Sequence, residues 1–206
     1  VRRDQLMSVA RMTTRRTAII GAILIGLGPI SMALYTPAMP ELVHAFGTTE
    51  AMIKLSLSFY FIGFAGAQLV SGPFSDAFGR RMAALSFLAI YVAGSLIAAF
   101  APSVEWLLAG RLIQGIGASV GVTVSRAIVR DQFTGIEASR LLNLIGIILA
   151  VGPALGPTLG GLALAAFDWQ AVFILMIGFG AISTGAVVFF MPETTSPDPG
   201  LIRPVR

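Results

Sequence analysis

The sequence contains no cysteine, a single histidine and few charged residues, which make up only 12% of the chain. Without cysteine the chain forms neither a disulfide nor a thiolate metal site, and nucleophilic catalysis by a cysteine is excluded. The lone histidine, His44, provides no cluster of imidazole ligands. We therefore expect no metal site of thiolate or histidine ligands and no covalent chemistry at a cysteine.

What the sequence does contain is apolar residues: 56% are hydrophobic and the mean hydropathy is +0.86. These values are too high for a soluble domain and predict an integral membrane protein whose partner is the lipid bilayer. The net charge of +4 does not point to nucleic acid, because the basic residues are divided among short segments between apolar runs.

Apolar runs long enough to cross a bilayer, which takes roughly 20 residues, occur six times. The runs do not alternate in polarity with a period of two, which argues against a β-barrel. They predict an all-α membrane protein with one six-helix bundle over residues 17–191. The expected spans are Thr17–Pro37, Leu55–Ser75, Met82–Phe100, Trp106–Ser125, Leu141–Ala165 and Trp169–Met191.

The charges that flank these runs predict the orientation. Val1–Arg16 holds five arginines and one acid, and the apolar run after it is too long for the ~7–15-residue apolar region of a signal peptide. With this segment inside, Lys54 is the only basic residue in the outer loops. We predict a multi-pass membrane protein with both termini cytoplasmic. Residues 192–206, with four prolines, have the composition of a linker or tail.

Two inner loops carry a charged pattern. In Gly72–Arg81, glycines permit a tight turn, an aspartate can accept backbone hydrogen bonds, and a pair of arginines follows. We predict that Arg80 or Arg81 pairs with Asp131 to close the cytoplasmic side, the alternative being a solvated charge cluster. The candidate residues of this cytoplasmic gate are Gly72, Asp76, Gly79, Arg80, Arg81, Arg130 and Asp131.

Arg111 is the one basic residue inside a predicted span. A guanidinium near the bilayer centre costs from ~3 to over 10 kcal/mol, so it should face a polar interior and have a partner. Gln114, Gly115 and Ala118 follow at i+3, i+4 and i+7 and so lie on the same helix face. The alternative is that Arg111 extends to the outer headgroups, which lie ~8 Å away if Trp106 marks the interface.

The first and second spans also carry candidate residues of the substrate pathway. Ser31, Met32 and Tyr35 on the first span and Tyr60 and Gly63 on the second combine aromatic, thioether and small polar groups, a mixture that suits amphipathic substrates. Packing against neighbouring helices is the alternative for each.

The fifth span repeats glycine at i, i+4 and i+8, which makes a ridge without side chains where another helix can approach. Prolines beside the ridge favour a bend, and the alternative is a packing face with no role in transport. The residues concerned are Gly152, Pro153, Gly156, Pro157, Gly160 and Gly161.

The Gly72–Arg81 loop matches the pattern Gly-x-x-x-Asp-x-x-Gly-Arg-Arg, and in this the chain resembles the major facilitator superfamily of transporters. Arg111–Ala118 is similar to that family's fourth-helix motif and Gly152–Gly161 to the fifth-helix motif of its antiporters. Leu34–Pro40 is similar to the first-helix motif of drug:proton antiporters of the Bcr/CflA type.

The resemblance implies two six-helix bundles in the complete transporter, each a pair of inverted three-helix repeats, with this chain as the N-terminal bundle. It implies efflux of drug-like or metabolite molecules by proton antiport through an alternating-access cavity in the plasma membrane, here a bacterial inner membrane. It also implies a proton gradient in place of any cofactor, and no enzyme activity. The partners would be a small-molecule substrate, protons, and a complementary six-helix half or a second copy. The alternatives are a metabolite uptake transporter and a non-transporting half or truncated fragment that acts as an interaction module.

One position departs from the family pattern. Ala33 stands where the first-helix motif commonly carries an acid, four positions before Pro37. The counter-charge of Arg111 is therefore expected from the missing half, from the substrate, or from helix carbonyls and Gln114. An anionic or zwitterionic substrate follows as an expectation.

Overall fold

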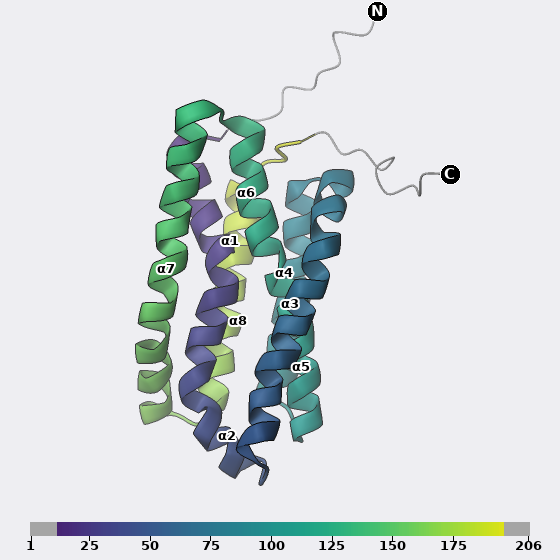
Figure 1. Cartoon of the computed structure of the whole chain (residues 1–206), viewed down its shortest axis with the longest axis vertical. Helices are drawn as coiled ribbons and strands as arrows, with labels where there is room; N and C mark the ends of the chain where they lie inside the picture. Colours follow the sequence, from purple (N-terminus) through teal and green to yellow (C-terminus); the bar gives the residue numbers. More distant parts are fainter. Residues whose placement is uncertain (1–11, 196–206) are drawn as a thin grey trace, which may run out of the picture.

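The computed structural model describes residues 12–195, which fold into one bundle of upright helices (Figure 1). The elements, in chain order, are α1 (Thr14–Tyr35), η1 (Thr36–Ala38), α2 (Met39–Ala45), α3 (Glu50–Phe78), α4 (Arg80–Ala99), α5 (Val104–Ala118), α6 (Val120–Gln132), α7 (Gly135–Ala166) and α8 (Gln170–Phe190).

Among the described residues, six helical segments are long and apolar enough to cross a membrane, which confirms the predicted spans. The first runs through α1, η1 and α2, and the fourth through α5 and α6. Only Ser119 separates α5 from α6, and its backbone stays right-handed helical (φ −58°, ψ −34°), so the two helices form a single span. Most of the segments are longer than their apolar runs; the fourth, for example, extends from Val104 to Gln132 and so includes the polar residues that follow Ser125.

The stretch predicted as a tight inner loop is mostly helix. α3 continues past Pro73 to Phe78, and Gly79 is the only residue between α3 and α4. Gly79 has φ +94°, a backbone conformation that other residues rarely adopt. The chain therefore reverses at a single glycine, and this places Arg80 at the start of α4.

Close approaches of helix backbones hold the centre of the bundle together. α5 packs between α3 and α4, and α1 packs against α6, α7 and α8. A Cβ atom placed on Gly115 would lie 2.1 Å from the carbonyl oxygen of Tyr60, and one on Gly63 would lie 2.2 Å from that of Leu112. Glycine at these two positions is what lets α3 and α5 touch.

The glycine ridge of the fifth span faces α1. A Cβ atom on Gly156 would lie 2.1 Å from Ala33 Cβ, and one on Gly160 would lie 2.6 Å from the Leu34 carbonyl oxygen. Both Pro153 and Pro157 lie inside α7 without ending it. Two other residues of the motif, Gly152 and Gly161, are also in α7, and a Cβ on Gly161 would meet nothing within 4 Å.

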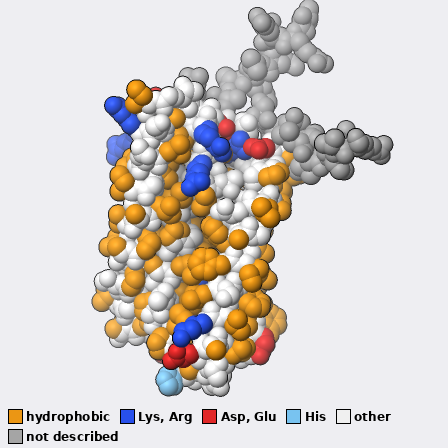
Figure 2. All heavy atoms as spheres, viewed as in Figure 1, with side chains coloured by type: hydrophobic (Ala, Val, Ile, Leu, Met, Phe, Trp, Pro, Cys, Tyr) orange, Lys and Arg blue, Asp and Glu red, His pale blue; other side chains and the backbone are white. Residues whose placement is uncertain are grey.

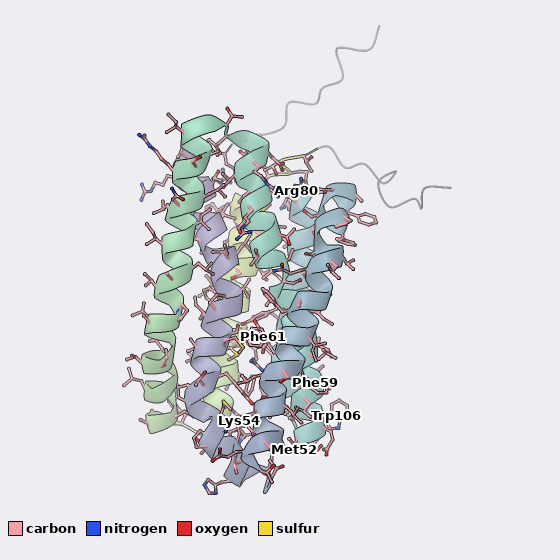
Figure 3. All side chains as sticks on the ribbon, viewed as in Figure 1. Met52, Lys54, Phe59, Phe61, Arg80 and Trp106 are labelled. Carbon is pink, nitrogen blue, oxygen red and sulfur yellow. The ribbon has the colours of Figure 1, made fainter. Side chains whose placement is uncertain are left out.

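The surface in view carries its charges near the two ends of the bundle, with hydrophobic side chains between them (Figure 2). Arg80 marks one end, and Lys54 and Trp106 lie near the other (Figure 3). Of the predicted flanks, residues 1–11 of the basic segment and 196–206 of the tail lie outside the described residues.

Candidate functional site

Arg111 lies at the centre of the bundle and is fully buried, with 0% of its surface exposed. Its Cζ atom lies 4.3 Å from the centroid of the Tyr35 ring and 4.4 Å from that of Tyr60. α5 places Arg111 against rings supplied by α1 and α3. The guanidinium therefore points into the bundle and does not extend to the outer headgroups.

Uncharged side chains accept hydrogen bonds from the guanidinium of Arg111. The Nη1 atom of Arg111 donates to Gln114 Oε1, one helical turn along α5, and Nη2 donates to Met32 Sδ at 3.3 Å. The Nε atom is buried and has no hydrogen-bond partner among residues 12–195, and no carboxylate in this range forms an ion pair with Arg111. Arg111, Gln114, Met32, Tyr35 and Tyr60 are called the arginine site below.

Gln114 connects the arginine site to α4 and α8. Its Nε2 atom donates to Ser95 Oγ at 2.6 Å and to Met176 Sδ at 3.2 Å. Ser95 Oγ in turn donates to the carbonyl oxygen of Tyr91 at 2.8 Å, and Tyr91 Oη shares a 2.6 Å hydrogen bond with Ser31 Oγ. Because each partner is buried, this network fixes the amide orientation of Gln114.

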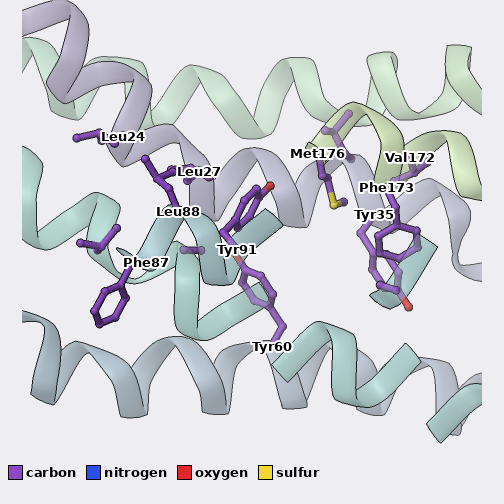
Figure 4. Close-up of a cluster of buried hydrophobic side chains, with 14 of the residues drawn as sticks. Leu24, Leu27, Tyr35, Tyr60, Phe87, Leu88, Tyr91, Val172, Phe173 and Met176 are labelled. Carbon is purple, nitrogen blue, oxygen red and sulfur yellow. The ribbon is translucent and has the colours of Figure 1, made fainter. Parts of the chain in front are cut away.

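The two rings beside Arg111 are held by hydrogen bonds of their own. Tyr35 Oη shares a 2.6 Å hydrogen bond with Ser56 Oγ, and the Tyr35 ring packs against Phe173 at a centroid separation of 5.9 Å. Tyr60 Oη donates to the Gly28 carbonyl oxygen at 3.3 Å. Figure 4 shows Tyr35 beside Phe173, and Tyr60 near Tyr91. The ring faces are therefore preorganised for a cation.

A cavity of about 460 Å³ lies between α1, α3 and α7, and two members of the arginine site, Met32 and Tyr60, form part of its wall. Phe61, exposed on α3, lies where α1 and α3 face each other in Figure 3 and also lines the cavity. Arg111 lies directly behind the wall. The lining residues of this α1–α3–α7 cavity are Gly28, Pro29, Met32, Ala33, Thr36, Tyr60, Phe61, Phe64, Pro153 and Pro157.

The other predicted pathway residues have different positions. Gly63 and Gly115 lie where α3 and α5 cross, and Ala118 is 1% exposed in the apolar core. Ser31 is buried beside Tyr91. These residues support the arginine site from behind and do not line the cavity.

At the other candidate site, Arg80 joins three helices. Its Nε atom donates to Asp131 Oδ2 at 2.9 Å, which confirms the predicted contact between the two inner loops. Nη1 pairs with Asp76 and donates to Ser75 Oγ at 3.1 Å. The side chains of Arg80 and Asp131 are 10% and 19% exposed. This pair is therefore better shielded from solvent than an ordinary surface salt bridge.

Glu193, which the sequence reading missed, completes this cluster. Its Oε1 atom accepts from the backbone N–H of Arg80 at 2.8 Å, and Oε2 accepts from that of Arg81 at 3.2 Å. The residue before α4 is Gly79, which has no side chain to cap the helix. A carboxylate from the segment after α8 takes that role. The only sequence signal was the glycine before α4, which leaves the first N–H groups of that helix open to an acceptor from another segment.

The remaining gate candidates lie around this cluster. Arg81 Nη2 donates to the Val188 carbonyl oxygen at 2.8 Å, which attaches α4 to α8. Arg130 is exposed and lines a different pocket with Ile25, and within residues 12–195 it takes part in no ion pair. Gly72 is half-buried in α3, where a Cβ would meet nothing within 4 Å.

Six candidate spans around a buried arginine and its hydrogen-bond network define a multi-pass α-helical membrane protein. The family model of the Major Facilitator Superfamily matches residues 21–204, and the chain belongs to this family, whose members are transporters and not enzymes.

Several curated relatives share about a third or more of their aligned residues with the chain. An uncharacterized MFS-type transporter, YdgK of Bacillus subtilis (strain 168), is 39% identical over 157 residues, which cover 74% of the chain and 39% of the relative. A chloramphenicol resistance protein of Pseudomonas aeruginosa is 38% identical over 82% of the chain and 40% of its own length. The multidrug resistance protein MdtL of Klebsiella pneumoniae (strain 342) is 34% identical over 83% of the chain and 44% of its own length.

Among solved structures, the human organic anion transporter MFSD10 (TETRAN) superposes with a TM-score of 0.74 at 24% identity, covering 93% of the chain and 51% of that protein. This likeness shows the fold. The chain spans about two fifths of the length of these curated relatives and half of the solved one.

Proposed function

We propose that the chain is one half of a secondary active transporter that exports amphipathic small molecules by proton antiport. The complementary six-helix half, or a second copy, would lie across the α1–α3–α7 cavity, and substrate would bind between the two. The observation that carries this proposal is the position of the arginine site: Met32 and Tyr60 contact Arg111 and also form part of the cavity wall.

The chemistry of the wall supports a drug-like substrate. Phe61 and Phe64 supply aromatic surface, and Met32 has a flexible thioether that adapts to molecules of different shape. The names of the multidrug and chloramphenicol resistance relatives agree with export of such molecules.

The positive charge of Arg111 favours substrates that carry a negative charge, namely anions and zwitterions. Arg111 has no carboxylate partner among the described residues, and its Nε atom is unpaired there. A rotamer change of Met32 or a small displacement of Tyr60 would expose the guanidinium to the cavity. An anionic group of the substrate would then receive a charge-assisted hydrogen bond where Met32 now accepts one.

Proton coupling needs a group that binds and releases a proton. Ala33 packs against Gly156 and lines the cavity, so no acid is present at that position of the first helix. The coupling group is therefore assigned to the complementary half or to the substrate. The orientation in a bacterial inner membrane, with Lys54 outside and both termini cytoplasmic, rests on the distribution of basic residues.

Transport in proteoliposomes, with and without a complementary half, tests the proposal. An anionic amphipathic dye and, for comparison, uncharged chloramphenicol are loaded separately under a pH gradient, and movement of the dye opposite to the proton flux is expected. Movement in the same direction as the protons identifies an uptake transporter. If no compound moves in either preparation, transport is rejected in favour of a non-transporting interaction module.

A substitution at Arg111 tests the substrate class. Arg111→Lys keeps the charge but loses the planar fork of donors, so anionic compounds should compete at least about tenfold less well, while uncharged chloramphenicol should be little affected. Unchanged binding of the anionic dye would remove the assignment of Arg111 to substrate charge.

A further inference from the structure

A second cavity of about 560 Å³ lies between the start of α1 and the end of α8 and shares no residue with the α1–α3–α7 cavity. The walls of this cavity along the two helices are apolar and exposed: Ile19 on α1 is 50% exposed, and Ile182 and Phe190 on α8 are 62% and 57% exposed. Because α1 and α8 are both membrane spans, this α1–α8 groove opens toward lipid.

One end of the groove is basic. Arg15 and Arg16, in the first turn of α1, line it together with Thr13. Arg16 Cζ lies 5.8 Å from the centroid of the Phe190 ring, and its Nε atom is buried without a hydrogen-bond partner in residues 12–195. Neither arginine forms an ion pair within this range. The basic end therefore has unused donors above an apolar groove.

We propose that the α1–α8 groove binds one anionic phospholipid from the leaflet that faces the start of α1. Arg15 and Arg16 would donate to the headgroup phosphate, whose charge is also favoured at a helix N-terminus. An acyl chain would lie along Ile19, Ile182 and Phe190. The groove runs along α1 from Arg16 to Ile23, a length of about 10 Å at the helical rise per residue, which takes it from headgroup depth into the hydrocarbon region.

The shape of the groove selects a lipid over a soluble anion. A free phosphate would use the two arginines but would leave the apolar side uncovered, whereas a phospholipid matches both parts. The proposal requires only that α1 and α8 span the membrane, and it does not depend on whether the chain transports a substrate.

The charge requirement is tested by lipid titration of the intact protein in mild detergent, with bound lipids counted by native mass spectrometry. Phosphatidylglycerol should bind more tightly than phosphatidylcholine with the same acyl chains. The double variant Arg15→Gln/Arg16→Gln should lose about thirtyfold in phosphatidylglycerol affinity, because each basic residue near an anionic membrane surface contributes roughly 1 kcal/mol and about 1.4 kcal/mol corresponds to a factor of ten. Arg140→Gln, which removes an exposed arginine from α7 outside this groove, is the matched control and should leave the affinity unchanged.

The apolar requirement is tested by filling the groove. A Cβ atom on Gly185 would meet nothing within 4 Å, so the Cβ of Gly185→Leu fits there, and the rest of the side chain would occupy the groove that Gly185 lines. It should weaken phosphatidylglycerol binding at an unchanged melting temperature. Equal affinity for the two lipids, or full affinity in the double arginine variant, would overturn the proposal. Equally strong binding of soluble glycerol phosphate would overturn it as well, because the site would then take a free phosphate.

Discussion

The guanidinium carbon of Arg111 lies 4.3 Å from the centre of the Tyr35 ring, and this contact takes the place of an acidic counter-ion in the described part of the bundle. A cation over an aromatic face gains about 2 kcal/mol or more when both are removed from water. Tyr35 is itself 0% exposed, so the contact is fully shielded from solvent.

Removal of the ring should therefore destabilise the bundle. Tyr35→Leu is expected to cost about 2–4 kcal/mol in free energy of unfolding, because it leaves Arg111 with less compensation and opens a cavity beside Phe173. Tyr35→Phe keeps the ring face and loses only the hydrogen bond to Ser56, so it should cost about 1 kcal/mol. Denaturant or thermal unfolding in detergent measures both, and equal losses would show that the ring face contributes nothing.

The pair formed by Arg80 and Asp131 is expected to hold the cytoplasmic side closed in the conformation described. Asp131→Asn should weaken the interaction with Arg80 by about 1–3 kcal/mol. This lies between the values for exposed and buried pairs, because both side chains are largely shielded from solvent. Labelling of single cysteines introduced on the cytoplasmic side, which is simple in a chain without cysteine, should then become faster. Unchanged labelling and transport in Asp131→Asn would discard the gate.

Glu193 is expected to stabilise the start of α4. Glu193→Ala removes the acceptor for the backbone N–H groups of Arg80 and Arg81, and the loss of a helix cap costs about 1 kcal/mol. Glu50→Ala is the control: Glu50 also lies in the first turn of a helix, α3, but it and its partner Lys54 are exposed at the other end of the bundle, so its loss should cost less. Equal melting temperatures of the two variants would contradict the capping role.

Two glycines of α7 should respond differently to the same substitution. Gly156→Ala brings a Cβ atom to 2.1 Å from Ala33 Cβ, so α1 and α7 must separate, at a cost of about 1–3 kcal/mol. Gly161→Ala meets nothing within 4 Å and should be neutral or slightly stabilising. If thermal unfolding in detergent shows equal stability for the two variants, the ridge does not set the separation of these helices.

Orientation is tested by cysteine labelling in intact cells. A cysteine at His44, exposed at the end of α2, should react with a membrane-impermeant maleimide, and one at Ser139, exposed near the start of α7, should react only after lysis. The positive-inside distribution sets this expectation. The opposite labelling pattern would invert the proposed topology.

Several properties followed from the sequence alone because they depend on local pattern. The length of apolar runs predicted the membrane spans, and the helical repeat placed Gln114 on the same face as Arg111. The pairing of Arg80 with Asp131 was also predictable, since consecutive inner segments at one end of a short-looped bundle bring opposite charges together.

Tertiary structure alone decided which groups from other helices surround Arg111. Met32 lies 79 residues away in the chain and contacts Arg111 because α1 and α5 meet in the bundle. Helical periodicity predicts which face of a helix is polar, but not which helix lies opposite it. That choice depends on where glycines such as Gly63 and Gly115 let two backbones touch. The same holds for Glu193, whose capping role exists only because the end of α8 lies beside the start of α4.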